Sequence, residues 1–202
     1  GLSGAGTVDN KSGTGTYTLT AGANDATSTF SGVIQNTSGK VALLKTGTGT
    51  VTLDGPPSTY TGGTTVDQGK LVFNVLVYQH NLAPGPITIN PGATLEKTGG
   101  GTWFSLAIDR PVTINGGTLK FGSGAVARVT LNDNAFLDGA LDFYPYPSYQ
   151  LAYTGTQFGA RISALYLNPN PVTGDLAFTV NDGADANDLT INAITAGLAD
   201  RK

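Results

Sequence analysis

Short runs in which apolar and polar residues alternate recur along the chain. Examples lie at residues 17–19, 41–44, 50–53 and 176–180. Alternation places successive side chains on opposite faces of a β-strand, so each run has one apolar face. No stretch of about a dozen residues keeps the period of an amphipathic helix. The pattern therefore predicts an all-β chain of short strands joined by turns.

Three of these runs belong to a sequence repeat. Residues 66–73, 89–96 and 114–121 share an order of apolar residue, polar residue, spacer, glycine, small or polar residue and leucine. Their first residues are 23 and 25 positions apart. A period of about 24 residues that holds several strands is typical of a solenoid, in which each coil stacks on its neighbour. We expect a parallel β-helix; an antiparallel sandwich, with Asn-Gly-Gly as a hairpin turn, is the alternative.

Stacked repeats should align residues of one type in ladders. The apolar positions expected to point inward are Val66, Leu71, Ile89, Leu95, Ile114, Leu119, Leu131 and Phe136. Gly69, Gly92 and Gly117 should turn the chain at equivalent corners, with a φ that glycine tolerates best. A weaker copy of the repeat at 131–136 has asparagine in place of glycine. Asparagine should keep that corner, because it also tolerates positive φ.

The composition narrows the possible partners. Charged residues make up 12% of the chain and the net charge is −3. Lysine and arginine are scattered singly, so neither nucleic acid nor a membrane surface is an expected partner, and we expect no membrane insertion by this segment. There is no cysteine, so no disulfide framework can support the fold. Stability must come from stacking and hydrogen bonding.

Four consecutive segments carry a resemblance to a known family. They are STFSGVI at 28–34, LKTGTGTVTL at 44–53, YTGGTTV at 60–66 and GKL at 69–71. Over about residues 28–74 the chain closely resembles the autotransporter-associated β-strand repeat, also called the passenger-associated transport repeat. The resemblance implies a right-handed parallel β-helix (a β-solenoid) in a bacterial autotransporter passenger. It also implies a place outside the cell or on the bacterial outer surface, and a stalk or adhesive role.

No pattern in the sequence predicts a catalytic, cofactor-binding or metal-binding site. His80 is the one histidine, and no motif places a nucleophile and a carboxylate beside it. Asp182, Asp185 and Asp188 recur at every third position, which is not the spacing of a calcium loop. Turn-forming aspartate explains this cluster without a metal ion.

The aromatic segment at about 143–153 is the least repeat-like part of the chain. Exposed tyrosine rings can stack on sugars or on a partner chain, because they combine a large apolar face with a polar edge. The candidate binding surface consists of Tyr144, Tyr146, Tyr149 and Tyr153. The alternative is an excursion that packs over an apolar side of the solenoid.

The sequence thus predicts one β-helix module over residues 1–202, a segment of a longer repeat array or a stacking filament unit. Its expected role is a cell-surface stalk, an adhesin passenger segment or a filament building block, and not an enzyme. A glycan- or partner-binding module is one alternative. A polysaccharide-degrading β-helix is another, which would need clustered carboxylates. We expect the end rungs to be covered by adjoining segments of the chain or by head-to-tail copies.

Overall fold

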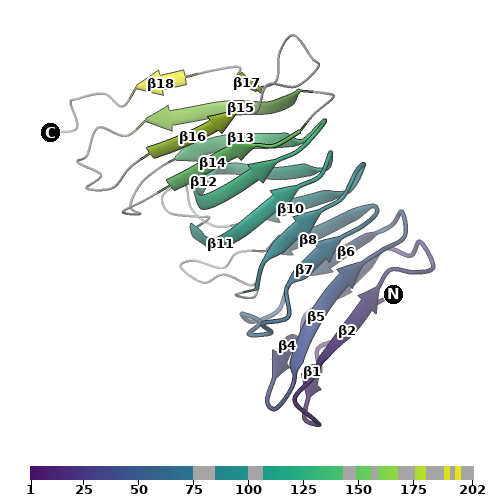
Figure 1. The fold of residues 1–202 in the computed structure, drawn as a ribbon. Coiled ribbons are helices and arrows are strands. Elements are labelled where there is room, and N and C mark those ends of the chain that lie inside the picture. The colour runs from purple at the N-terminus through teal and green to yellow at the C-terminus, as the bar shows by residue number, and fades with distance from the viewer. Residues whose placement is uncertain are drawn as a thin grey trace, which may run out of the picture.

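The structure, a computed structural model, is built of β-strands. It describes residues 1–74, 85–99, 107–142, 149–155, 159–167, 176–180, 189–191 and 194–196. All strand pairs among these residues are parallel. Parallel pairing excludes the antiparallel sandwich and confirms the β-solenoid (Figure 1).

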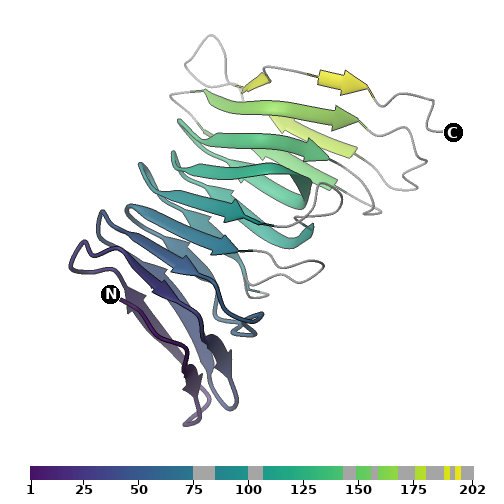
Figure 2. The same cartoon turned by 180° about the vertical axis from the view of Figure 1, so that it is seen from behind.

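Two long sheets run the length of the stack, and a short one adds a third side near the N-terminus. Sheet I contains β2 (Thr16–Ala21), β5 (Lys40–Lys45), β7 (Thr64–Val66), β9 (Ile87–Ile89), β11 (Ala107–Ile114), the end of β12 (Thr118–Leu131), β14 (Tyr149–Tyr153) and β16 (Leu176–Val180). Sheet II contains β3 (Ser28–Phe30), β6 (Thr50–Leu53), β8 (Lys70–Asn74), β10 (Thr94–Thr98), the start of β12, β13 (Phe136–Asp142), β15 (Ala160–Leu167), β17 (Leu189–Ile191) and β18 (Ile194–Ala196). Sheet III pairs β1 (Thr7–Asn10) with β4 (Val33–Asn36). Figures 1 and 2 show the stack from opposite sides, with β1 and β4 at one end and β17 and β18 at the other.

The core is a set of ladders between the sheets. In sheet I, Val66, Ile89, Ile114 and Leu131 are register partners of their neighbours. In sheet II, a second ladder consists of Leu71, Leu95, Leu119 and Leu137. All eight of these side chains are fully buried. The ladders confirm the predicted core with one exception, which lies on β13.

Phe136, predicted to point inward, faces outward and is half-buried, while Leu137 occupies the ladder. The corner from Leu131 to Leu137 is one residue longer than the corner from Ile114 to Leu119. Because side chains alternate along a strand, a shift of one residue moves each side chain to the other face. The prediction for Phe136 was wrong for this reason.

The corners need positive φ at several of the predicted positions. Gly69 and Gly92 have φ of 62° and 75°, and Asn134 takes the same conformation with a φ of 58°. The prediction for Gly117 was wrong in its cause, because positive φ falls on Gly116 instead. Gly117 is needed for space: a Cβ there would lie 2.5 Å from the carbonyl oxygen of Asn90.

The predicted excursion at 143–153 is in part a regular strand. Residues 143–148 lie outside the described part of the chain, whereas Tyr149–Tyr153 forms β14 between β12 and β16. Alternation along β14 turns Leu151 and Tyr153 into the core. None of the residues that the structure describes forms a helix long and apolar enough to cross a membrane.

Candidate functional site

The lysine of the Lys-Thr-Gly-Thr-Gly segment lies inside the solenoid. Lys45 is the last residue of β5, and its side chain is fully buried. Its ammonium donates hydrogen bonds to the carbonyl oxygens of Thr46, Gly47 and Gln68 at 2.8, 2.7 and 3.0 Å. Burial lowers the pKa of Lys45. The side chain therefore joins corners of two successive coils and is not presented to a substrate.

The burial of Lys45 was not predicted from the sequence. A signal was present, because Lys45 follows the buried Val41 and Leu43 at every second position of β5. Alternation alone places the three side chains on one face. The residue type nevertheless argued for exposure, since a lysine is almost never fully buried unless its charge is compensated.

Other polar residues of the repeat also face inward. Tyr60 and Thr64 are buried, and their hydroxyl oxygens lie 2.6 Å apart. Between them, Gly62 leaves room for the preceding coil, because a Cβ there would lie 2.5 Å from the carbonyl oxygen of Val41. The side chains of Tyr60 and Thr64 therefore fill the interior of the repeat.

A chain of side-chain hydrogen bonds follows the corner between sheets I and II. Asn90 donates from Nδ2 to Asp67 at 2.8 Å, and Asn115 donates to Asn90 at 3.3 Å. Asn132 donates in turn to Asn115, and the Thr154 hydroxyl donates to Asn132. We call these five residues the corner ladder. Every donor points toward the N-terminal coil, where the Asp67 carboxylate accepts the last hydrogen bond.

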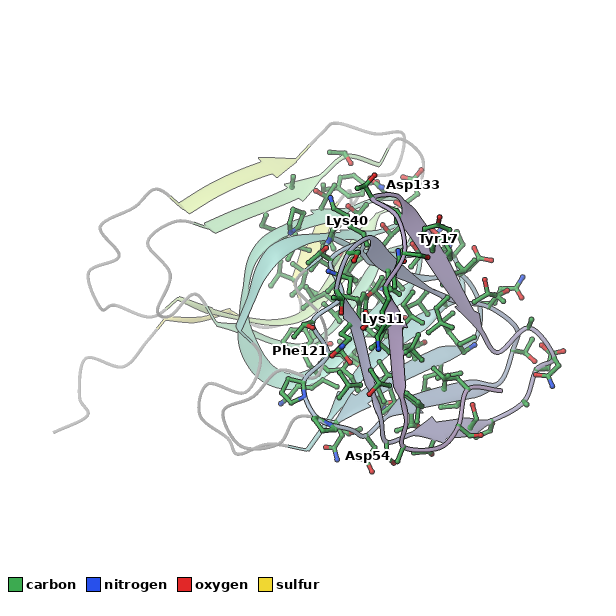
Figure 3. The ribbon with its side chains drawn as sticks, turned by 90° about the horizontal axis from the view of Figure 1, so that it is seen from below. Lys11, Tyr17, Lys40, Asp54, Phe121 and Asp133 are labelled. Atoms are coloured by element: carbon green, nitrogen blue, oxygen red, sulfur yellow. The ribbon has the colours of Figure 1, made fainter. Side chains whose placement is uncertain are left out.

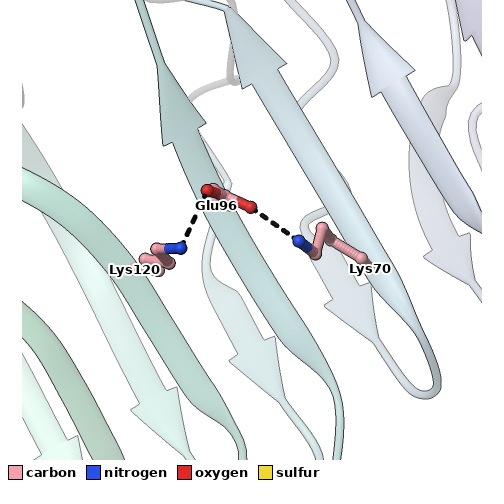
Figure 4. A network of polar contacts seen from close by, with 3 residues as sticks. All are labelled: Lys70, Glu96 and Lys120. Carbon is pink, nitrogen blue, oxygen red and sulfur yellow. Dashed lines mark hydrogen bonds and ion pairs between the residues drawn. The ribbon is translucent and has the colours of Figure 1, made fainter.

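Charged side chains alternate across the outer face of sheet II. Glu96 on β10 accepts a hydrogen bond from Lys70 on β8 at 2.8 Å, and the Lys120 ammonium on β12 lies 3.3 Å from its other oxygen (Figure 4). The hydrogen bond from Lys70 holds the pKa of Glu96 below its usual range, with a smaller contribution from Lys120. The lysine side chains are 41% and 49% exposed. Pairs this exposed contribute about 1 kcal/mol or less each.

Farther along the outer face of sheet II, polar and charged side chains also contact one another. The Arg161 guanidinium lies 4.8 Å from the centre of the Phe136 ring. The Ser163 hydroxyl donates to Asp138 at 3.1 Å. On the outer face of sheet I, threonines are register partners on four neighbouring strands: Thr65, Thr88, Thr113 and Thr130. The two long sheets therefore present different surfaces.

Each acidic side chain that the structure describes accepts a hydrogen bond from a neighbouring group. These carboxylates belong to Asp9, Asp25, Asp54, Asp67, Glu96, Asp133 and Asp138. Within the described residues, no three histidine, cysteine or acidic side chains gather where they could hold a metal ion. His80, Asp182, Asp185 and Asp188 lie outside the described part.

Of the four tyrosines of the candidate surface, the structure describes the side chain of Tyr153 alone. Tyr144 and Tyr146 lie outside the described residues, and only the backbone of Tyr149 is described, in β14. Tyr153 is fully buried, and its hydroxyl donates to Asp133 at 3.0 Å. Tyr153 is therefore a core residue and was wrongly assigned to a binding surface.

The N-terminal end of the stack presents an open layer (Figure 3). Among the described strands, β1 pairs with β4 alone and β2 pairs with β5 alone. Tyr17 on β2 is the register partner of the buried Val41, yet it is 58% exposed. Leu2, Val8 and Leu19 are partly buried against the core. Tyr17 and the unpaired edges of β1 and β2 thus face outward at this end of the described part of the chain.

Comparison with known proteins supports the resemblance noted above. The passenger-associated-transport-repeat profile matches residues 10–34 and 43–73. The adhesin BmaC autotransporter of Brucella suis biovar 1 (strain 1330) is 37% identical over 131 residues. The alignment covers 61% of this chain and 3% of that adhesin, so the chain spans a small part of the relative's length. No solved structure matches the chain.

Proposed function

We propose that the chain is a segment of an exported autotransporter passenger that acts as a rigid surface spacer. The premise is the match of the passenger-associated-transport-repeat profile to residues 10–34 and 43–73. The main support is the position of the matched residues. The second match runs from β5 to β8, and its distinctive polar residues, Lys45, Tyr60 and Thr64, are buried. Residues used to hold coils together serve a mechanical role.

A non-enzymatic role agrees with the state of the carboxylates. A polysaccharide-cleaving β-helix needs a pair of carboxylates free to act as acid and base or to bind a cation. In the described part of the chain, every acidic side chain accepts a hydrogen bond from a structural neighbour. In a rigid spacer, these carboxylates need no role beyond the structural hydrogen bonds that they accept.

Surface display would test the proposal. The chain is placed between an export signal and an outer-membrane translocation domain, with an epitope at its tip. We expect the epitope to reach the cell surface and to lie farther from the membrane as tandem copies are added. Leu95→Asp, on the buried face of β10, should abolish the folded spacer, whereas Thr94→Asp, on the outer face, should not. An epitope distance independent of copy number would contradict the spacer role.

Adhesive binding is a second candidate, because the relative is named an adhesin. The remaining tyrosines of the candidate surface, Tyr144, Tyr146 and Tyr149, are the residues to examine. Binding of the chain to a glycan array or to host cells should fall when the three are replaced together by alanine. The matched control is Tyr17→Ala at the N-terminal end of the stack. Equal binding by both variants would remove the tyrosines from consideration.

We also propose that the open N-terminal layer receives a further rung, from an adjoining segment or from another copy. Exposed Tyr17 and the free edges of β1 and β2 are the features that such a rung would cover. Electron microscopy and sedimentation over a range of concentrations separate the two sources. Filaments that grow with concentration indicate copies stacked head to tail. A chain that stays monomeric, with Tyr17 as reactive as free tyrosine even when further N-terminal coils are added, would refute the proposal.

A further inference from the structure

The corner ladder contains the chain's one Asn-Gly step, Asn115-Gly116. In such a step the backbone nitrogen of glycine can attack the side-chain amide of asparagine, because glycine has no side chain to shield that nitrogen. We propose that Asn115-Gly116 is a latent self-modification site. The corner ladder holds Asn115 in its amide form, and opening of this corner lets it convert irreversibly to aspartate or isoaspartate.

The geometry holds the Asn115 side chain at both polar atoms. Nδ2 donates to Oδ1 of Asn90 at 3.3 Å, and Oδ1 accepts from Nδ2 of Asn132. The backbone N–H of Asn115 donates to the carbonyl oxygen of Ile89 at 2.7 Å. Rotation of the side chain toward the nitrogen of Gly116 therefore requires the loss of both ladder hydrogen bonds.

The reaction needs water and no other reactant. The nitrogen of Gly116 loses its proton to solvent and attacks Cγ of Asn115, so a C–N bond forms in a five-membered succinimide. The bond from Cγ to Nδ2 breaks, and Nδ2 leaves as ammonia after it takes a proton from solvent. Water then opens the ring at either carbonyl carbon. One opening yields aspartate, and the other yields isoaspartate, in which the main chain runs through the side-chain carbon.

The product cannot rebuild the corner. The side chain of an aspartate at 115 has no N–H to donate, so one of its oxygens would face Oδ1 of Asn90, which is also an acceptor, across the two coils. Isoaspartate also adds one carbon to the main chain, just before β12 begins at Thr118. Because refolding does not reverse this change in the main chain, the modified corner is a permanent record that this part of the solenoid has opened.

The test compares conversion rates by peptide mapping and mass spectrometry, with isoaspartate identified by enzymatic methylation. The folded chain, the urea-denatured chain and three variants are incubated in parallel at mildly alkaline pH. Asn90→Ala and Asn132→Ala each remove one partner of Asn115. Asn36→Ala is the matched control, because Asn36 accepts a hydrogen bond from Thr61 at another corner.

We expect conversion at Asn115 to be slower in the folded chain than in the denatured chain by about tenfold or more, the factor for one or two net hydrogen bonds. Asn90→Ala and Asn132→Ala should recover much of that rate, and Asn36→Ala should not. Melting curves establish that the variants remain folded at the incubation temperature. If a variant unfolds, the folded and denatured forms of the unmodified chain still decide the matter. Equal rates for those two forms, or no acceleration in a folded ladder variant, would overturn the proposal.

Discussion

At the residue scale, the interior of this solenoid tolerates a charge because the corners supply acceptors for it. A buried ammonium is costly unless its donors are satisfied. Lys45 meets three backbone carbonyl oxygens within 3.0 Å, and these belong to two successive coils. The lysine of the repeat thus does at a corner what a bound cation could do. Its role follows from its surroundings and not from any reactivity of the amine.

Replacing Lys45 by methionine keeps the length of the side chain and removes its donors. Since the carbonyl oxygens of Thr46, Gly47 and Gln68 then lose this partner inside the fold, we expect the free energy of unfolding to fall by about 1–3 kcal/mol. Urea denaturation measures the change. The control is Lys40→Met at the exposed start of β5, which should change stability by about 0.5 kcal/mol or less. Equal effects would show that the buried ammonium has no special role.

At the element scale, the alternation along each strand decides what a substitution costs. Phe136 and Leu137 are neighbours on β13, yet Leu137 is fully buried and Phe136 stacks with Arg161 on the outer face. The larger side chain is therefore the less important one for the core. This order is the reverse of the order expected from residue size alone.

The two β13 residues give a direct test of register. Leu137→Ala should lower the free energy of unfolding by about 2–5 kcal/mol, as for other fully buried leucines. Phe136→Ala should cost about 1 kcal/mol, because it removes a partly exposed ring and one cation–π contact. Chemical denaturation of both variants measures the difference. A larger loss for Phe136→Ala would restore the original assignment of Phe136 to the ladder.

Two corner glycines are needed for two different physical reasons, backbone conformation at one and lack of space at the other. A Cβ on Gly92 would meet open space, but Gly92 has a φ of 75°, so Gly92→Ala should cost about 1–2 kcal/mol of backbone strain. Gly117→Ala would instead press on the backbone of the preceding coil, with an expected cost of about 2–3 kcal/mol. Thermal denaturation ranks the two variants. If Gly117→Ala is harmless, the coils are farther apart than the structure places them.

At the scale of the whole molecule, polar contacts between coils run along the outside as well as the corners. Glu96 links β8, β10 and β12 through Lys70 and Lys120. Such contacts are individually weak at the surface. Their common feature is that each joins coils that are distant in sequence and adjacent in space. Acid and salt should therefore loosen the stack.

The pH dependence has a definite sign. The pKa of Glu96 is lowered from 4.5 on folding, chiefly by Lys70, so its contribution is complete above about pH 4.5 and is lost as pH falls through the lowered value. The pKa of Asp9 is lowered in the same way, first by the Thr37 hydroxyl. We expect unfolding by urea to become easier below about pH 4.5. Glu96→Gln should flatten this decline, whereas Thr94→Ala on the same strand should not. An unchanged slope in Glu96→Gln would show that its ion pairs are absent in solution.

The repeat pattern was sufficient to predict the all-β class, the stacking of coils and most of the core. The reason is that these properties are local: alternation assigns the faces of a strand, and a repeat length near one coil aligns Leu71, Leu95 and Leu119. The positive φ of Gly69, Gly92 and Asn134 was also predictable, since it depends on residue type at a corner.

The tertiary structure decided everything that depends on how one coil meets the next. Corner lengths that differ by one residue turned Phe136 outward. The close approach of the Asn90 carbonyl oxygen leaves no room for a side chain at Gly117. The neighbouring coils also placed Lys45 and Tyr153 in the interior, although lysine is mostly exposed in proteins and tyrosine is intermediate. Alternation specifies two faces of a strand, but which face is inside depends on the register between coils, and register is a property of contacts between residues far apart in the sequence.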